Sequence, residues 1–555
     1  MGHAMNAFLT PLACLALCLA LLTGTASGAT PGKPNIVFIL ADDLGWGDLG
    51  SYGQKLIKTP HLDRMAAEGL RLTRHYSGNA VCAPSRCVLM TGKHPGHAFI
   101  RNNRSMQPEG QHPIPAEEVT LPELLKTQGY ATGAFGKWGL GGPDTTGEPL
   151  KQGIDRFYGY NCQSVAHNFY PTYLWDNQQK VPLKNTAFSA QARLQPGEDP
   201  LADASYARFR GTEYSADLIA AQARDFIRQH KDKPFFCFVP TTVPHLALQV
   251  PEDSLAPYIG QWDDPPYPGG NGYLPHRHPR AAYAAMVSRM DEEVGRLMAL
   301  IKELGLDENT IFIFSSDNGP LYDKLGGTDC EFFNSHGGLR GRKGSLYEGG
   351  FRVPGIVRWT GHIQPGSTSD RVTGFEDWIP TLLELIGSAA TTPTGLDGIS
   401  FAPTLLGQAQ PERPFLYREF PAYGGQQCLL MGDWKAVRTD MMPGALKKKN
   451  AGGAGVGGGA SPGDGVSGGA AKAKGNAIVT VEKKDASGAV VQGKAVRAPL
   501  TLPPLQLYNL KTDPTESKDV AAEHPDIIAK MEAIMKGQHV SSKDFPFPVL
   551  DGRSE

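Results

Sequence analysis

The strongest constraint on the fold is a set of short apolar runs that each end in polar side chains. Residues 34–41 are almost wholly apolar and lead directly into Asp42 and Asp43. A continuous run of this kind, rich in β-branched residues, is typical of a strand buried on both faces of a parallel sheet. Residues 233–240 and 310–316 repeat the pattern. The chain is therefore predicted to be an α/β protein.

The carboxyl ends of these predicted strands are expected to form a cation site, because ligands of open α/β sheets lie beyond that edge. Two adjacent carboxylates such as Asp42 and Asp43 repel each other unless a cation lies near them. The alternative is a pair of helix N-caps, a position that Asp favours. Asp317 and Asn318 follow another predicted strand in the same way, which favours the metal. Four oxygen-bearing side chains suit Ca²⁺ or Mg²⁺ better than a soft metal.

Two further polar side chains follow predicted strands. Lys137 comes after a strand predicted at residues 130–135, between Gly136 and Trp138. These neighbours favour a packed loop, although a lysine in a loop is usually solvated. His245 comes after the strand at 233–240. A histidine near an acidic cluster is suited to general acid catalysis, and the alternative is a ring that only packs beneath the following loop.

The segment from Val81 to Gly92 predicts an anion site. Pro84 has a fixed φ and no N–H, so it favours the first turn of a helix, with Cys82 just before that helix. Free N–H groups and the helix dipole favour an anion there, and Arg86 adds a permanent positive charge. The alternative is a capped helix with a buried cysteine, the usual environment of an isolated cysteine.

The string Cys-x-Pro-Ser-Arg-x-x-x-x-Thr-Gly that begins at Cys82 resembles the signature of the sulfatase family. Gly-Lys-Trp at 136–138 and Lys-x-x-x-x-Glu-Gly-Gly-x-Arg-x-Pro from Lys343 resemble two other motifs of that family. The resemblance implies an alkaline-phosphatase-like α/β/α sandwich with a mixed, largely parallel sheet. It implies a catalytic domain at 30–413 and a small C-terminal α+β domain with an antiparallel sheet at 414–555.

The resemblance also implies a mechanism for sulfate ester hydrolysis. Cys82 would be oxidised to formylglycine (3-oxoalanine), whose hydrate attacks sulfur, displaces the alcohol and then expels sulfate. Ca²⁺, with Mg²⁺ as the alternative, would be bound together with the formylglycine by Asp42, Asp43, Asp317 and Asn318. Three basic side chains would surround the sulfate, namely Arg86, Lys137 and Lys343. His245 would protonate the leaving alkoxide or bind the ester oxygen.

One position departs from the family pattern. The family motif is Gly-Lys-Trp-His-Leu-Gly, and this chain has Gly139 where the family has the histidine. That histidine is expected to hydrogen-bond the formylglycine hydroxyl or the substrate. We expect His167 to enter the pocket as its substitute or as a substrate contact. The alternative is a surface or packing histidine.

Composition and the two low-complexity segments bear on partners and location. The chain has 54 basic and 56 acidic residues among 555, and this balance favours no nucleic acid partner. Residues 1–29 are predicted to be a signal peptide, with an uncleaved anchor or a lipoprotein as alternatives. We therefore expect a secreted or periplasmic protein without stable membrane insertion after cleavage. A Gly/Ala/Lys-rich insert at about 443–499 is expected to be flexible.

The sequence is compatible with three functions. The first is a sulfatase, which would also need a transient partner, the maturation enzyme that makes formylglycine. The second is a formylglycine-dependent phosphodiesterase or phosphonate hydrolase. The third is an inactive homologue that binds sulfated glycans. A sulfated carbohydrate is favoured over a small sulfated molecule because loop aromatic residues suggest stacking on sugars, namely Phe169, Tyr170, Tyr173, Trp175, Trp262 and Tyr267.

Overall fold

The structure is a computed structural model. It describes residues 1–2, 32–107, 109–442 and 502–552, together with the backbone of four two-residue strands between residues 478 and 497. The predicted signal peptide at 1–29 and the predicted flexible insert at about 443–499 lie almost entirely outside the described residues.

A large mixed sheet of eleven strands forms the centre of the molecule, in the order β10-β2-β9-β8-β1-β7-β3-β4-β5-β6, with β11 paired to β2. The neighbours β8, β1, β7, β3 and β4 run parallel, whereas β9, β5 and β6 pair antiparallel with their neighbours. The strands are β1 (Asn35–Ala41), β2 (Leu70–Tyr76), β3 (Ala131–Lys137), β4 (Arg156–Tyr160), β5 (Tyr173–Asp176), β6 (Gln179–Pro182), β7 (Phe235–Pro240), β8 (Thr310–Ser316), β9 (Arg352–Arg358), β10 (Ser367–Ser369) and β11 (Thr373–Gly374).

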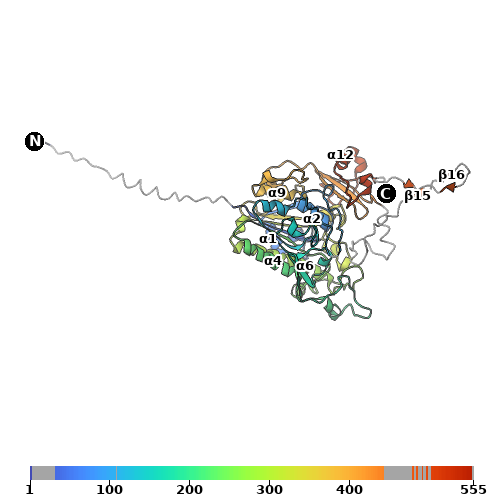
Figure 1. Ribbon diagram of the computed structural model, residues 1–555, viewed down its shortest axis with the longest axis horizontal. Coiled ribbons are helices and arrows are strands. Elements are labelled where there is room, and N and C mark those ends of the chain that lie inside the picture. Colours follow the sequence, from blue (N-terminus) through green and yellow to red (C-terminus); the bar gives the residue numbers. More distant parts are fainter. Residues whose placement is uncertain are drawn as a thin grey trace.

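Helices cover both faces of this sheet (Figure 1). One layer contains α1 (Pro60–Ala67), α4 (Ser215–His230) and α6 (Pro279–Glu303), and the other contains α2 (Cys82–Thr91), α3 (Leu121–Thr127) and α9 (Trp378–Leu385). Short helices in the same part of the chain are α5 (Glu252–Leu255), α7 (Cys330–Phe333), α8 (Glu348–Phe351) and α10 (Ala402–Leu405).

The alternation of side chains along β1 explains the two cores. Val37 and Ile39 face the layer of α1, α4 and α6, whereas Ile36 and Phe38 face the layer of α2, α3 and α9. Successive side chains of a strand point to opposite faces, so a strand buried on both faces must be apolar throughout. The predicted α/β/α sandwich with a mixed, largely parallel sheet is therefore confirmed.

A smaller antiparallel sheet lies in the C-terminal region, in the order β12-β13-β14-β19, and this predicted feature is also confirmed. Its strands are β12 (Leu416–Phe420), β13 (Gln426–Met431), β14 (Trp434–Arg438) and β19 (Gln506–Asn509). The helix α12 (Pro525–Lys536) packs on it through Met531 and Met535, and α13 (Pro548–Asp551) follows. The exact division of the chain at residue 413 stays a prediction.

One local expectation needs refinement. The helix predicted to start at Pro84 starts two residues earlier, so Cys82 is the first residue of α2 and not the residue before it. All ten residues of α2 are buried. Among the described residues, we find no helix with the length and apolar character needed to cross a bilayer.

Candidate active site

The site lies where β1 and β8 end side by side. In their parallel register Ala41 is opposite Ser316, so the next residues, Asp42 and Asp317, enter the same space. The backbone N–H of Asp317 donates to the carbonyl of Ala41 at 3.0 Å, which holds the two chain ends together. Asp43 has a left-handed backbone with φ of 65° and donates its N–H to Asp317 Oδ1 at 3.2 Å. Pairing of the sheet thus gathers three carboxylates from distant parts of the sequence.

Two buried cations on other elements face these carboxylates. Arg86 on α2 donates from Nε and Nη2 to Asp317 Oδ2, at 3.0 and 2.8 Å, and from Nη1 to the carbonyl of Lys137. Lys137, the last residue of β3, donates from Nζ to Asp42 Oδ2 at 2.6 Å. The two basic side chains are each 1% exposed, so their charges are stabilised by these carboxylates and not by water.

Cys82 lies between the third basic side chain and Asp42. Its Sγ donates to Asp42 Oδ1 at 3.6 Å, and Lys343 Nζ donates to Cys82 Sγ at 3.4 Å. Lys343 also forms an ion pair with Asp43, with Nζ 2.7 Å from Oδ1. Burial outweighs the two nearby lysines and raises the pKa of the Cys82 thiol to about 12. The unmodified side chain is therefore a protonated thiol at neutral pH.

The three carboxylates differ in their preference for charge. Burial raises the pKa of Asp317 to about 7, with a further contribution from the nearby charge of Asp42. Burial also raises the pKa of Asp43 despite the attraction of Lys343. For Asp42 burial is again the largest single effect and acts in the same direction, but the surrounding positive charges, with Lys137 first among them, together outweigh it, so the pKa lies well below its usual range. Ionising all three carboxylates is thus unfavourable unless another positive charge is present.

The side-chain amide oxygen of Asn318 is an acceptor that could serve as a metal ligand. Its Nδ2 donates to Asp43 Oδ1 at 2.7 Å and to the carbonyl of Gly319 at 2.9 Å, which fixes the orientation of the amide. Within the described part of the chain, the buried Oδ1 is left without a hydrogen-bond partner. An unpaired oxygen beside three carboxylates is a suitable ligand for a hard cation. The predicted metal ligands therefore lie together, and their chemistry fits Ca²⁺ or Mg²⁺.

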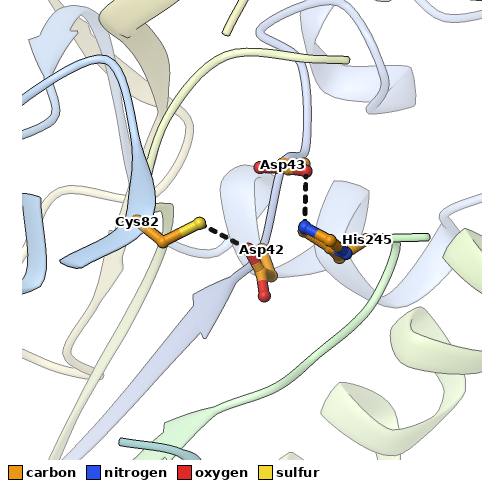
Figure 2. Close-up of side chains that lie close together, drawn as sticks. All are labelled: Asp42, Asp43, Cys82 and His245. Atoms are coloured by element: carbon orange, nitrogen blue, oxygen red, sulfur yellow. Dashed lines mark hydrogen bonds and ion pairs between the residues drawn. The ribbon is translucent and has the colours of Figure 1, made fainter. Parts of the chain in front are cut away.

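Two histidines close one side of the site. His245 Nδ1 donates to the carbonyl of Leu246 at 2.7 Å, so Nε2 is left to face Asp43 Oδ2 at 3.4 Å. Figure 2 shows this ring and Cys82 on opposite sides of the two aspartates, and potential ligand atoms of all four residues lie within 4.8 Å of one another. The ring of His167 stacks on His245 with centroids 4.6 Å apart. Burial holds the pKa of both imidazoles well below the usual value, so both rings are neutral.

Cys82 lines a pocket. Its wall includes three of the predicted site residues besides Cys82, namely His167, His245 and Lys343. It also includes seven residues that sequence reasoning missed, namely Asn103, Gln163, Tyr273, Leu321, Tyr322, Leu325 and Tyr423. These residues lie in loops and match no motif, so the chain carried no local signal for them. The Oδ1 of Asn103 accepts the Ala83 N–H at 2.9 Å, which leaves its Nδ2 as a donor.

The expected aromatic platform for a sugar is not formed by the predicted residues. Phe169 and Tyr170 are buried in the core, with 1% and 5% of their surfaces exposed. Tyr173 and Trp175 both donate to Glu109. Trp262 packs on Phe332 and Phe333, and Tyr267 donates to the carbonyl of Gly272. The prediction was wrong because these rings pack or hydrogen-bond within the protein, two of them on β5. The pocket has different aromatic residues, namely Tyr273, Tyr322 and Tyr423.

Comparison with known proteins gives a consistent result. A family model described as Sulfatase matches residues 34–388. Human arylsulfatase A is 36% identical over 420 residues, covering 73% of this chain and 74% of that protein. Human N-acetylgalactosamine-6-sulfatase is 33% identical over 414 residues, covering 71% and 69%. The crystal structure of Ps i-CgsB in complex with k-i-k-neocarrahexaose superposes with a TM-score of 0.66 at 23% identity, covering 93% of this chain and 94% of that one.

Proposed function

Since this chain belongs to the sulfatase family, the enzymes that hydrolyse sulfate esters, we propose that it does so at the strand-end site around Cys82. Its sandwich is the alkaline-phosphatase-like fold expected from the sequence. One observation carries the proposal: Arg86, Lys137 and Lys343 converge on the acidic cluster beside Cys82, where each pairs with a carboxylate.

Each of the three basic side chains beside Cys82 is already paired with a carboxylate. A bound sulfate ester would add a negative charge. A divalent cation held by Asp42, Asp43, Asp317 and Asn318, together with residue 82, would neutralise the carboxylates and polarise sulfate oxygens. With the carboxylates so engaged, Lys137 and Lys343 become free to bind the sulfate. We propose Ca²⁺ as the ion.

Residue 82 supplies the nucleophile in this proposal. When Cys82 is converted to formylglycine and hydrated, it offers an oxygen nucleophile with a second hydroxyl through which the aldehyde can be restored. Arg86 and Lys343 orient this residue and the sulfate, since Lys343 Nζ lies 3.4 Å from Cys82 Sγ. The thiol is 1% exposed in the folded chain, so the transient maturation enzyme must act before folding is complete.

His245 is proposed to assist the leaving group. Because Nδ1 donates to a backbone carbonyl, Nε2 is the atom that can hold a proton toward the ester oxygen. Burial holds the pKa of the His245 imidazole low and favours a neutral ring, whereas the negative charge of a bound sulfate ester would favour protonation. His167 stacks on His245 and lines the same pocket, so it is proposed to contact the substrate.

The substrate is proposed to be a sulfated carbohydrate. The pocket wall offers side-chain amides and tyrosine hydroxyls, which suit the hydroxyl groups of a sugar. One relative is named for an amino sugar sulfate. We further propose that residues 1–29 direct the chain to secretion or to the periplasm, and that residues 30–413 and 414–555 form its two domains.

The test is to produce the chain with and without a formylglycine-generating enzyme and to analyse the Cys82 peptide by mass spectrometry. We expect the aldehyde mass and turnover of 4-nitrophenyl sulfate or of N-acetylgalactosamine 6-sulfate. Cys82→Ala should abolish turnover, whereas Cys87→Ala, another buried cysteine of α2, should retain it. Preference for a phosphate diester or a phosphonate would favour that alternative. An unmodified Cys82 without turnover would favour a sulfated-glycan-binding protein.

A further inference from the structure

Gln163 lies in the pocket wall, and the nitrogen of its side-chain amide is an unused hydrogen-bond donor among the described residues. It follows β4 by three residues, and 6% of its surface is exposed. Its Nε2 is buried and has no hydrogen-bond partner among the residues that the structure describes. A buried donor without an acceptor is unfavourable, so natural proteins rarely retain one unless a ligand or water completes it. The pocket beside Cys82 is where such a ligand would enter.

Gly139 is the reason that this amide can lie there. A Cβ atom at Gly139 would be 2.7 Å from Gln163 Nε2, closer than two such atoms can approach. The backbone at Gly139 has φ of 87°, a conformation that also favours glycine. The amide of Gln163 therefore fills the space that a side chain at position 139 would occupy. Position 139 is two residues after Lys137 in the sequence, and Lys137 Nζ donates to Asp42 in the acidic cluster.

The segment that carries Gln163 is held in place on both sides. The Sγ of Cys162 donates to the carbonyl of Gly110 at 3.4 Å and lies 3.0 Å from Ser164 Oγ. Four residues after Gln163, His167 stacks on His245. The amide is thus positioned before any ligand binds, which lowers the entropic cost of using it.

We propose that Gln163 is a substrate-binding residue whose amide donates a hydrogen bond to an oxygen of the bound sulfate group. The inference rests on the proposed function, because it assumes that the sulfate lies over Cys82 and Lys343. An oxyanion offers acceptors in several directions, and the pocket that contains Cys82 and Lys343 also contains this unpaired donor. Gln163 takes no proton and forms no covalent bond.

The first test replaces the amide without emptying its space. In Gln163→Leu, we expect calorimetry to show that inorganic sulfate binds about tenfold to a hundredfold more weakly, the usual loss for a hydrogen bond to a charged group. The kcat/KM for 4-nitrophenyl sulfate should fall by a similar factor. Gln163→Glu should bind sulfate more weakly still, since its carboxylate repels the anion. Gln111→Leu is the matched control, because Gln111 is also buried with an unpartnered Nε2 but does not line this pocket.

The second test moves the amide instead of removing it. Gly139→Ala should push Gln163 aside and weaken sulfate binding in the wild-type background. In a Gln163→Ala background the same substitution should have little further effect on binding. The backbone strain at Gly139 is common to both backgrounds and cancels in this double-mutant cycle. A merely structural role of Gln163 would lower Tm without this coupling in sulfate affinity.

Two outcomes separate this inference from the function on which it rests. Unchanged sulfate affinity and kcat/KM in Gln163→Leu, alongside an active wild type, would overturn the role of Gln163 alone. A wild type that binds no sulfate and hydrolyses no sulfate ester would overturn both. A wild type that binds sulfate without turnover still allows the inference to be decided, because calorimetry measures binding directly.

Discussion

Ion pairs hold the charged side chains of the site in position. Each of three basic groups has its own carboxylate, and the partners come from elements far apart in the sequence, as in Arg86 with Asp317. Removing water from such charges is costly, and only well-made hydrogen bonds compensate for it. The site is therefore sensitive to geometry and not only to net charge.

Arg86→Lys is expected to be damaging although it keeps the charge. A lysine cannot reproduce the two bonds from Nε and Nη2 to Asp317 or the bond from Nη1 to the carbonyl of Lys137. We expect the free energy of unfolding to fall by roughly 2–4 kcal/mol, since each hydrogen bond to a charged group contributes about 1.5–3 kcal/mol, and kcat/KM to fall more than a hundredfold. Urea denaturation and kinetics would check this. Arg104→Lys, at a half-exposed arginine, should change neither; equal effects of the two would refute the argument.

Asn318→Ala is expected to weaken cation binding. The substitution removes the unpaired Oδ1 and the donor to Asp43, so two interactions of the acidic cluster are lost. We expect the affinity for Ca²⁺, measured by calorimetry on chelator-treated protein, to fall about tenfold to a hundredfold. Chelation should also lower the Tm of the wild type, and Ca²⁺ should restore it. Asn309→Ala, remote from the site, is the control, and an unchanged Ca²⁺ affinity of Asn318→Ala would remove Asn318 from the ligand set.

The packing of the strands determines where the functional side chains lie. Residues at the carboxyl ends of β1, β3, β7 and β8 meet because these strands run parallel in one sheet. Gly136, one residue before Lys137 in β3, allows β3 to lie close to β7: a Cβ at this position would be 2.0 Å from the carbonyl oxygen of Pro240. The spacing between these strands thus depends on a single missing methyl group.

Gly136→Ala is therefore expected to displace β3 and with it Lys137. The clash is with backbone, which cannot rotate away, and φ of 141° adds strain. We expect a loss of about 3 kcal/mol or more in unfolding free energy, together with a large loss of kcat/KM. Gly129→Ala provides the comparison, because its φ of 86° is also positive but nothing lies within 4 Å of its added methyl group. It should cost only about 1 kcal/mol and leave activity intact; the reverse order would contradict the packing argument.

The large sheet and the smaller C-terminal sheet are joined by buried polar contacts. Arg418 on β12 donates from Nη1 and Nη2 to Glu376 at 2.9 and 2.8 Å. Lys435 on β14 forms an ion pair with Glu348 at 2.9 Å, and all four of these side chains are almost completely buried. Tyr423, from the loop between β12 and β13, also reaches the pocket wall. The C-terminal sheet is consequently part of the site's structure and not an appendage.

The attachment of the C-terminal segment should weaken as pH rises. Burial and Arg101 lower the pKa of His539, but its bonds to Glu419 and Asp551 outweigh them and raise it above the usual value. A raised pKa means that the stabilisation is present in full below the unfolded pKa of about 6.5 and is lost as pH passes the folded pKa. Tm should therefore fall more steeply above neutral pH in the wild type than in His539→Gln. His362→Gln, at a ring stacked on Trp359, should keep the wild-type slope. Identical slopes in all three proteins would exclude His539 as the cause.

The sequence by itself determined the central strands, the sandwich and the residues that end each strand. These features are encoded locally: an apolar run fixes burial on both faces, and the polar residue after it must lie at the sheet edge. The motif from Cys82 to Gly92 likewise placed a helix almost correctly, and its resemblance to a family identified the family of the chain.

Only the tertiary structure decided which groups meet. The pairing of each cation with one carboxylate depends on strand register and on the rotation of α2, and neither can be read from a single segment. The amide of Gln163 fills the space above Gly139 because two loops, separated by 24 positions in the chain, converge. The aromatic residues predicted to stack on a sugar instead pack or hydrogen-bond within the protein. Contacts between distant segments, and not local composition, decide which side chains are exposed.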